Sequence, residues 1–218
     1  MLSVRSLSFR YRDTSVIRGL SLDVAPGDCM ILRGESGCGK STLLRLLCRL
    51  EAPQDGEMSL DGESYEAIPS HDLRRRVAYL QQIPVMLDGS VRDMLLLSQR
   101  YDRKHGNGIS DSGLRDMLVR ARLSDVDLDK NARDLSVGQQ QRVALIRLLV
   151  MRPDYLLLDE PAAALDANSA SIIHEWIADV HREHATSILM VTHAPLPDAP
   201  TVARRLLMNG GTLLEDAA

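Results

Sequence analysis

The pattern of polar and apolar residues in the first part of the chain begins with a period of two and then changes to the spacing of a helix. Residues 2–9 and 20–24 alternate with a period of two, as half-buried strands do, and residues 29–33 form a short apolar run. A glycine-rich loop follows, and residues 41–50 then repeat leucine at helical spacing. Residues 57–66 have the pattern of a hairpin, with Asp61 and Gly62 as its turn. The first part of the chain therefore predicts strands around one helix.

Helical periodicity dominates the middle of the chain. It runs through residues 90–123, broken by a loop at 104–108, and returns at 135–149. The pattern then predicts an apolar strand at 155–160, an amphipathic helix at 169–184, a strand at 187–193 and a hairpin around 209–211. Strands and helices that alternate on both sides of an inserted helical segment predict an α/β core with a helical subdomain.

Composition and charge narrow the class of protein. The chain has 218 residues, of which 44% are hydrophobic and 26% charged, and these are the proportions of a soluble globular protein. Its net charge of −4 does not favour nucleic acid or an anionic membrane as a partner. The basic run at residues 74–76 is short, and a solvated or salt-bridged face explains it better than binding to a phosphate backbone.

The sequence does not predict a secreted or membrane-spanning segment. No apolar stretch reaches the length of a membrane span, and residues 1–13 lack the apolar core of a signal peptide. Cys29, Cys38 and Cys48 are odd in number and lack the spacing of a metal site, which suits free thiols in a reducing cytosol. We therefore expect a cytoplasmic protein whose role at a membrane would need a separate chain.

The strongest motif is GESGCGKST at residues 34–42. It fits the pattern G-x-x-x-x-G-K-[ST] and lies between an expected strand and an expected helix, as a phosphate-binding loop must. Its glycines let successive backbone N–H groups point at phosphate oxygens. Its lysine adds a positive charge for the β- and γ-phosphates, and the hydroxyl that follows can bind Mg²⁺. The motif predicts nucleotide contacts from Gly34, Glu35, Ser36, Gly37, Cys38, Gly39, Lys40, Ser41 and Thr42.

Two of the expected strands end in chemically active residues. The strand at 155–160 ends in Asp159 and Glu160, at the edge where open α/β sheets bind ligands. We expect Asp159 to hold Mg²⁺ through water and Glu160 to polarise the water that attacks the γ-phosphate. His193 ends the strand at 187–193, at the same edge. Each of these residues alone is most often structural, and the functional interpretation depends on the nearby phosphate loop.

A second possible anion site lies at the start of the helix in residues 135–149, LSVGQQQRVALIRLL. This helix begins with small polar residues, and a helix N-terminus attracts negative charge through its dipole and its free N–H groups. Ser136 can donate a hydroxyl hydrogen bond, and Gly138 permits close approach of the backbone. The sequence thus predicts two helix ends that bind phosphate in one chain.

These residues together resemble the ATP-binding subunits of ABC transporters over nearly the whole chain. GESGCGKST looks like the Walker A loop, YLLLDEP like the Walker B strand, LSVGQ like the signature LSGGQ, and AALD at 163–166 like the D-loop. His193 matches the switch histidine, Gln82 the glutamine of the Q-loop, and Tyr11 the aromatic residue that stacks on adenine.

The resemblance implies the fold and its division. It implies an α/β P-loop ABC ATPase core, a mixed sheet flanked by helices, with an antiparallel β subdomain and an inserted α-helical subdomain. We expect residues 1–218 to form one ABC ATPase domain. Residues 1–82 and 152–218 would form the core with the β subdomain, and residues 83–151 the helical subdomain that carries the signature.

The resemblance also implies an ATPase that uses ATP and Mg²⁺. Its catalytic residues would be Glu160, His193, Lys40 and Gln82, and its metal site would comprise Ser41, Gln82 and Asp159, the last through water. In this family two subunits dimerise head to tail, and each ATP lies between the Walker A loop of one and the signature of the other. This would explain the second phosphate-binding helix end. A second copy of the chain would contribute Ser136, Gly138, Gln139 and Asp166 in trans.

Two departures from the family pattern bear on turnover. Val137 replaces the first glycine of the signature pair, and a β-branched residue is expected to be strained if the site needs a positive φ. Residues 161–164, PAAA, lack the hydroxyls that are common before the D-loop, which we expect to loosen the hydrogen bonding there.

Two functions are compatible with the motifs. The first is a transport ATPase that energises a separate membrane permease from the inner face of the membrane, with the permease on the apolar surface of residues 83–95. Within transporters, residues 74–95 and 141–160 look most like the ATPase subunit of a bacterial iron exporter, which suggests a metal ion as cargo. The second is a soluble ABC ATPase without transport, such as an iron–sulfur cluster assembly ATPase. DNA-repair and translation members carry long inserts or a second cassette, which this sequence lacks.

The remaining candidates have simpler explanations. Cys38 lies inside the phosphate loop, but as a small filler residue it needs no redox role. His174, His181 and His184 lie along one expected helix, and no carboxylate or cysteine converges on them in the sequence pattern. We therefore expect these histidines on a solvated flank of the helix.

Overall fold

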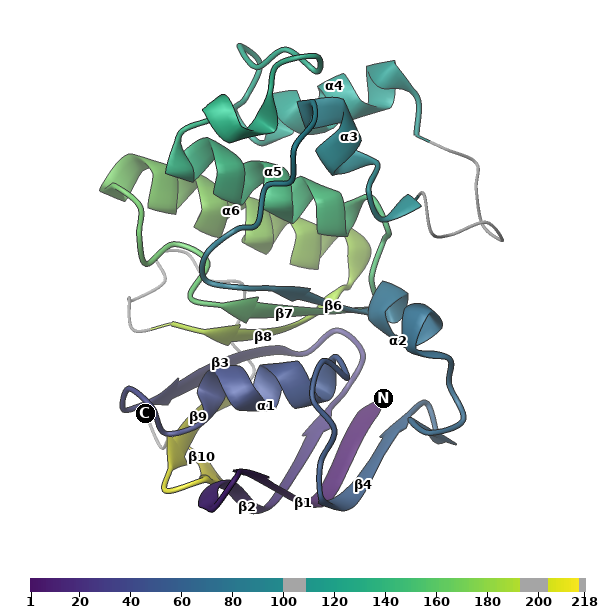
Figure 1. Ribbon diagram of the computed structural model, residues 1–218, viewed down its shortest axis with the longest axis vertical. Coiled ribbons are helices and arrows are strands. Elements are labelled where there is room, and N and C mark those ends of the chain that lie inside the picture. Colours follow the sequence, from purple (N-terminus) through teal and green to yellow (C-terminus); the bar gives the residue numbers. More distant parts are fainter. Residues whose placement is uncertain (100–108, 193–203, 216–218) are drawn as a thin grey trace.

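The computed structural model describes residues 1–99, 109–192 and 204–215 (Figure 1). Its strands are β1 (Leu2–Tyr11), β2 (Thr14–Val24), β3 (Cys29–Gly34), β4 (Asp55–Leu60), β5 (Glu63–Ser64), β6 (Val77–Leu80), β7 (Tyr155–Asp159), β8 (Ser187–Val191), β9 (Arg204–Asn209) and β10 (Thr212–Glu215). Its helices are α1 (Lys40–Leu47), α2 (Ser70–Arg76), α3 (Val91–Leu95), α4 (Asp111–Arg120), α5 (Val137–Leu149) and α6 (Ala167–His184), with a 3-10 helix, η2, at Ala132–Asp134.

The central sheet has the strand order β10–β9–β3–β8–β7–β6. The neighbours from β9 to β6 run parallel, and β10 pairs antiparallel with β9, so the sheet is mixed, as predicted. Alternate residues of β3 enter two apolar clusters. Cys29 and Ile31 belong to the cluster that contains α5 and α6, whereas Met30 and Leu32 belong to the cluster that contains α1. Burial on both faces explains why the sequence of this strand is continuously apolar.

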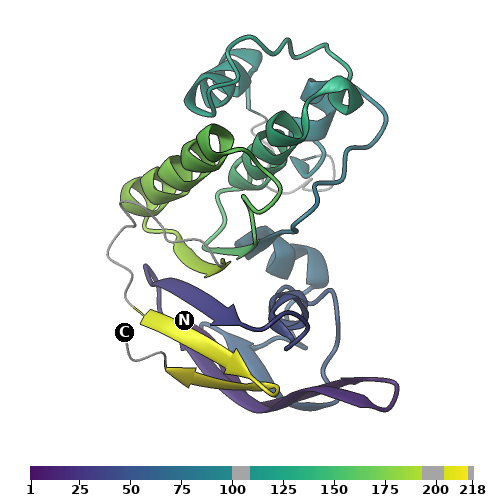
Figure 2. The same cartoon turned by 90° about the vertical axis from the view of Figure 1, so that its left-hand side faces the viewer.

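A second, antiparallel sheet has the strand order β2–β1–β4–β5. Leu2 in β1 pairs with Val24 on one side and with Leu60 on the other. Helix α1 lies between this sheet and the central one in both views (Figures 1 and 2), and its leucines share one cluster with residues of both sheets. The predicted antiparallel β subdomain is therefore present, and it packs the helix that follows the phosphate loop.

Helices α5 and α6 lie side by side over the opposite face of the central sheet (Figure 2). A buried arginine on α5, Arg142, joins this layer to α4. Its guanidinium Nη1 donates to the main-chain oxygens of Ala121 and Arg122, both at 3.2 Å, and its Nε donates to Gly138 O at 3.1 Å. Burial lowers the pKa of Arg142, and the three carbonyl oxygens supply the hydrogen bonds that its charge needs.

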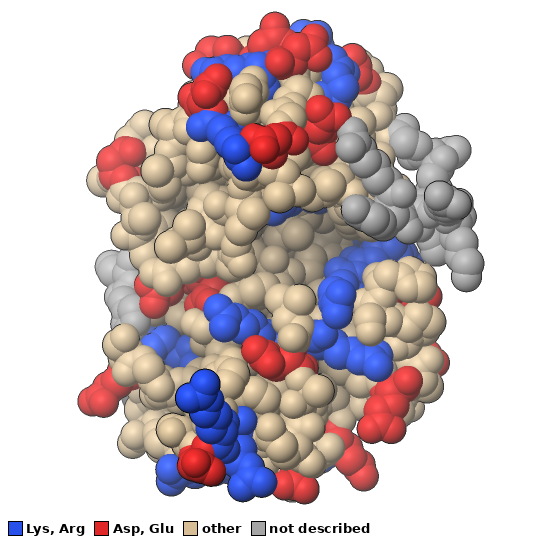
Figure 3. Space-filling view, viewed as in Figure 1, with Lys and Arg blue, Asp and Glu red and all other residues tan. Residues whose placement is uncertain are grey.

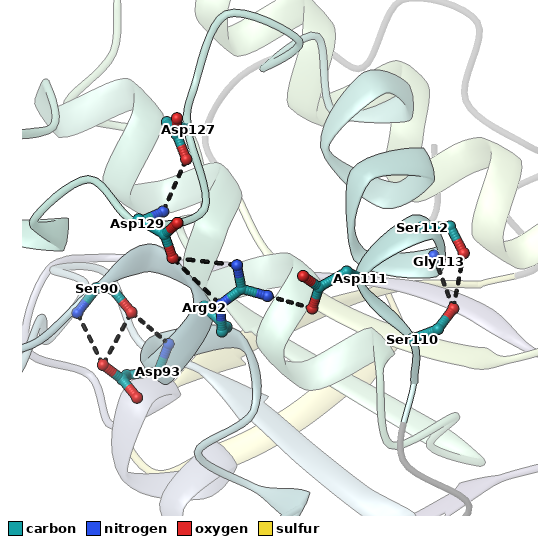
Figure 4. Close-up of polar contacts among 9 residues, drawn as sticks. All are labelled: Ser90, Arg92, Asp93, Ser110, Asp111, Ser112, Gly113, Asp127 and Asp129. Atoms are coloured by element: carbon teal, nitrogen blue, oxygen red, sulfur yellow. Dashed lines mark hydrogen bonds and ion pairs between the residues drawn. The ribbon is translucent and has the colours of Figure 1, made fainter.

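Arg92 of α3 connects three segments of the helical layer (Figure 4). Its guanidinium forms ion pairs with Asp111, at the start of α4, and with Asp129, the latter at 3.1 Å. Ser90 and Asp93 form a capping box at the start of α3, and Ser110 caps α4. Because the Arg92 ion pairs are largely solvated, they fix the arrangement of these short helices more than they add stability.

Most predicted elements are confirmed. The hairpin at 57–66 turns at Asp61 and Gly62, whose φ angles of 54° and 83° suit a two-residue turn. The hairpin around 209–211 is β9 and β10, with Asn209 paired to Thr212. The helices predicted at 135–149 and 169–184 are α5 and α6, and the strands at 29–33 and 155–160 are β3 and β7.

Several boundaries were predicted wrongly. β2 begins at Thr14 rather than at residue 20. Residues 14–19 pair with β1 but are mostly exposed, so they lack the apolar alternation from which a strand is predicted. The helix predicted at 41–50 ends at Leu47, and the first helix of the segment predicted at 90–123 ends at Leu95. The loop predicted at 104–108 lies outside the described residues. Helix α2 and strand β6 were missed, because α2 buries Leu73 alone and β6 has four residues. The basic run at 74–76 is partly salt-bridged, as expected, since Arg76 pairs with Asp61 and Asp154.

Candidate functional site

The loop at residues 34–42 leaves β3 and leads into α1. Gly34, Gly37 and Gly39 have φ angles of 149°, 78° and 110°, which only glycine adopts readily. Glu35, Ser36 and Gly37 are exposed at the tip of the loop. The residue that precedes α1 is Gly39, which has no side chain to accept from the first N–H groups of the helix. The loop therefore offers backbone N–H donors of the kind that bind phosphate.

Lys40 directs its charge across the loop. Its Nζ donates to the main-chain oxygens of Gly34 and Glu35, both at 2.8 Å, and the residue is only 6% exposed. The loop thus holds an ammonium group beside its own backbone donors. This arrangement places positive charge where a phosphate group would meet the loop.

The carboxylate of Asp159, at the end of β7, faces the start of α1. Ser41 Oγ donates to Asp159 Oδ1 at 3.0 Å, and the Tyr79 hydroxyl donates to Asp159 Oδ2 at 2.9 Å. Asp159 is 5% exposed, so both of its oxygens are held away from bulk water. Hydroxyl and carboxylate oxygens are the ligands that Mg²⁺ prefers, and the residues present therefore fit that cation. Tyr79 is not predicted as a site residue from the sequence, because it lies on β6, a strand of only four residues that was not predicted.

Glu160 follows Asp159 and has a φ of 48°, which is uncommon for a residue with a side chain. Its backbone N–H donates to Val191 O at 3.0 Å, and this bond ties the strained residue to β8. Gln82 Nε2 donates to Glu160 Oε2 at 3.3 Å. The structure thus brings Gln82, Asp159, Glu160 and Ser41 to one edge of the central sheet, as the sequence predicts.

The start of α5 is a capping box. Ser136 Oγ accepts from the N–H of Gln139 at 3.3 Å, and Gln139 Oε1 accepts from the N–H of Ser136 at 3.0 Å. Val137 is the first helical residue, is 55% exposed and does not have a positive φ. The strain expected from a β-branched residue at this position is therefore absent.

Gly138 is explained by packing within the chain. A Cβ built on Gly138 would lie 3.2 Å from Ser169 Oγ on α6 and 3.6 Å from Leu165 Cδ2. Asp166 caps α6 by accepting from the N–H of Ser169 at 3.0 Å, and this bond is the main cause that lowers the pKa of Asp166. The first turns of α5 and α6 are therefore close neighbours, which the sequence did not indicate.

The segment at 161–164 is held by its own backbone. Ala163 N donates to Glu160 O and Leu165 N donates to Ala162 O, each at 3.2 Å. The missing hydroxyls therefore do not leave this turn without hydrogen bonds.

Tyr11 is hydrogen-bonded outside the phosphate loop. Tyr11 packs edge-on against Phe9, with ring centroids 4.7 Å apart, and its hydroxyl donates to Glu51 Oε1 at 3.1 Å. Its side chain is 41% exposed, so a ring face can reach solvent. His193 lies outside the described residues. Within the described residues, Ser136 and Gln139 form hydrogen bonds with each other and not with the loop at 34–42.

The sequence profile of the ABC transporter family matches residues 17–163. The chain belongs to the ABC transporter family. The match includes the glycine-rich loop, Gln82, the start of α5 and the two carboxylates, which are the parts that the structure gathers around the sheet edge and the ends of α5 and α6. The fold is the P-loop fold of ABC ATPase domains.

Individual members of the ABC family resemble the chain over most of its length. Protein STAR1 of Oryza sativa subsp. japonica is 41% identical over 196 residues, covering 88% of this chain and 56% of that protein. The probable iron export ATP-binding protein FetA of Escherichia coli is 32% identical over 194 residues, covering 88% of this chain and 84% of that protein. The chain spans just over half the length of the rice relative.

A solved structure of an ABC protein has the same fold. The structure of cbiO1 from Clostridium perfringens, described as part of the ABC transporter complex cbiONQ, superimposes with a TM-score of 0.80 at 25% identity. The superposition covers 98% of this chain and 86% of that one. The expected ABC fold class is therefore confirmed over almost the whole chain.

The histidines of the ABC chain do not form a metal site in the part of the chain that is described. His184 is exposed, as expected, but His174 and His181 are partly buried. Burial lowers the pKa of His174, and His181 Nδ1 lies 3.0 Å from Thr186 O.

Residues 1–99, 109–192 and 204–215 contain no helix long and apolar enough to span a bilayer.

The three thiols of the ABC chain should differ in reactivity. Burial raises the pKa of Cys29 and of Cys48 to about 11, so about one part in a thousand is thiolate at pH 8. Cys38 is partly exposed in the phosphate loop. We expect iodoacetamide to label Cys38 alone in the native chain at pH 8 and all three cysteines after unfolding, as measured by mass spectrometry. Cys38→Ser is the control, and rapid native labelling of that variant would contradict the prediction.

Proposed function

We propose that this chain binds and hydrolyses ATP and that it energises a separate membrane permease. The proposal depends on one observation: the glycine-rich loop at 34–42 lies beside Asp159 and Glu160 at one edge of the central sheet. The Lys40 ammonium is held within that loop. Backbone N–H groups of residues 34–42 would bind the phosphates, with the Lys40 ammonium on the β- and γ-phosphates. Tyr11 would stack on the adenine.

The chemistry assigned to Glu160 is that of a general base. Its carboxylate accepts a proton from water while the water oxygen bonds to the γ-phosphorus and the bond to the β–γ bridging oxygen breaks. The products are ADP and phosphate. Gln82, which donates to Glu160 in the structure, would orient the same water, and His193 would contact the γ-phosphate.

Mg²⁺ would be held by Ser41 Oγ, by Asp159 through water and by the Gln82 side chain. When bound, the cation supplies positive charge to the β- and γ-phosphate oxygens. The Ser41–Asp159 hydrogen bond of 3.0 Å shows that these two oxygen donors already face each other.

We infer that a second copy of the chain completes the ATP site. Ser136, Gly138, Gln139 and Asp166 would approach the partner's ATP in trans. The adjacent first turns of α5 and α6 support this, since two helix N-termini at one place attract an anionic phosphate group. In this division, residues 83–151 would act as the helical subdomain that carries the signature, and residues 1–82 and 152–218 as the core.

The permease surface that we propose is the segment after Gln82. Ile83, Val85 and Leu87 are 74%, 51% and 45% exposed, which makes a compact apolar surface. Arg147 Nη1 donates to Val85 O at 3.2 Å, so this segment is attached to α5. A permease bound here would hold the chain at the inner face of the membrane. Basic and acidic side chains are mixed in the upper part of the face in Figure 3, and basic side chains gather beside the hollow at its middle. The net charge of −4 does not favour nucleic acid as the partner.

The experiment that tests this function is affinity purification of the tagged chain from gently solubilised membranes of its host. We expect a polytopic membrane protein in equal stoichiometry. The double variant Ile83→Glu, Val85→Glu should lose it, whereas Val119→Glu, at an exposed apolar residue of α4, should retain it. A soluble partner instead would contradict transport coupling and favour a soluble ABC ATPase such as one for iron–sulfur cluster assembly. Retention of the membrane protein by the double variant would contradict only the surface at Ile83 and Val85. The residues that line the pore of that permease would then test whether the cargo is a metal ion.

A further inference from the structure

The carboxylate of Asp159 is held by two hydroxyl groups from different elements. Ser41 Oγ, on α1, donates to Oδ1, and the Tyr79 hydroxyl, on β6, donates to Oδ2. Asp159 is buried and Tyr79 is half-buried, so water competes weakly for either bond. Tyr79 has no part in the roles described above, yet it occupies one of the two oxygens of the carboxylate assigned to the cation.

The hydrogen bond of Tyr79 has a fixed direction. The interaction with the Tyr79 hydroxyl is the main cause that raises the pKa of Arg45, and a guanidinium can only donate. The Tyr79 hydroxyl donates its one proton to Asp159 Oδ2 at 2.9 Å, which leaves only its oxygen lone pairs to face Arg45. The Tyr79 hydroxyl therefore lies between the Arg45 guanidinium and the Asp159 carboxylate, with its proton on the side of the carboxylate.

The two hydroxyls differ in what ATP binding demands of them. Ser41 follows Lys40 at the start of α1 and is itself assigned to the cation, so its oxygen would bind Mg²⁺ through a lone pair while its proton stays directed at Asp159 Oδ1. Tyr79 lies on β6, hydrogen-bonded in the central sheet beside β7, and has no competing assignment. Tyr79 is therefore the hydroxyl whose one assignment is to Asp159, and its bond to Oδ2 keeps the carboxylate from rotating.

We propose that Tyr79 is a positioning residue for Asp159: its hydroxyl holds Oδ2 and leaves Oδ1 directed at the cation that accompanies ATP. The proposal rests on the proposed function, since it assumes that Mg²⁺ and ATP bind at this edge of the sheet. It assigns Arg45 the lesser role of holding the Tyr79 hydroxyl in its donating orientation.

The test is the Mg²⁺ dependence of nucleotide binding, followed with the fluorescent analogue N-methylanthraniloyl-ATP. Tyr79→Phe removes only the hydroxyl. We expect the Mg²⁺ concentration for half-maximal effect to rise about tenfold, as for the loss of a hydrogen bond to a charged group, while affinity in EDTA stays unchanged. Tyr65→Phe is the matched control, because it removes a buried hydroxyl that donates to Leu47 O at 3.0 Å, away from Asp159. The control should keep the wild-type Mg²⁺ midpoint.

An unchanged Mg²⁺ midpoint in folded Tyr79→Phe overturns the proposal. Equal losses of affinity with and without Mg²⁺ also overturn it, because they indicate a general structural role. If Tyr79→Phe does not fold, Arg45→Met decides, with a smaller rise expected and no rise contradicting the proposal. If the wild-type chain binds the analogue without any Mg²⁺ effect, the Tyr79 proposal fails while nucleotide binding stands. If the wild-type chain does not bind the analogue at all, the proposed function fails instead.

Discussion

Glu160→Gln is expected to slow ATP hydrolysis by about a hundredfold or more while ATP binding stays close to wild type. An amide cannot accept the proton of the attacking water, but it fills the same space and can still pair with Gln82. Glutamate and glutamine have the same unbranched shape near the backbone, so the positive φ of residue 160 costs no more in the variant than in the wild-type chain. The measurements are phosphate release at saturating ATP and equilibrium binding of the fluorescent analogue.

A matched control for this variant is Glu175→Gln. Glu175 lies on α6, where it accepts from Arg122 at 2.9 Å, and it takes no part in the proposed site. The control should hydrolyse ATP at the wild-type rate. Near-normal turnover in Glu160→Gln would remove Glu160 from the role of general base.

The same variant should reveal the second copy. With ATP and Mg²⁺ and without hydrolysis, we expect Glu160→Gln to double in mass by light scattering relative to the ADP sample. A monomer under these conditions would show that ATP alone does not join two chains and that a permease must hold them together.

Gly34→Ala is expected to destabilise the fold by about 3 kcal/mol and to abolish nucleotide binding. A Cβ at Gly34 would lie 2.4 Å from Met208 O in β9 and 2.9 Å from Cys38 Sγ. Gly34 is paired with Met208 in the central sheet, so the clash can be relieved only if β3 and β9 separate or the loop moves. The φ of 149° adds a conformational penalty for any residue with a side chain.

Gly37→Ala is the control that distinguishes the steric clash at Gly34 from the cost of a positive φ. A Cβ at Gly37 meets no atom within 4 Å, although its φ is 78°. We expect this control to lose only about 1 kcal/mol, measured by urea unfolding. Equal losses of stability in the two variants would mean that the contact with β9 does not matter.

The phosphate loop and the carboxylates were predictable because their signals are local. The spacing of glycine, lysine and hydroxyl residues in 34–42 depends only on neighbours in the sequence, and so does an apolar strand that ends in Asp159 and Glu160. Helix α2 and strand β6 were not predictable in the same way. They bury few side chains, and their positions depend on pairing with β7 and on the ion pairs of Arg76.

Most strands and helices, the mixed α/β class and the residues of the phosphate loop were therefore predictable from the order of residues, because periodicity and backbone geometry act over a few neighbouring residues. The contacts of Tyr79 with Asp159 and of Gly138 with Ser169 became known only from the folded chain. These pairs are joined by packing between elements far apart in the chain, and side-chain contacts across such separations leave no pattern in the order of residues. Val137 is a further example. The strain expected there required a positive φ, and the structure shows that the first residue of α5 does not have one.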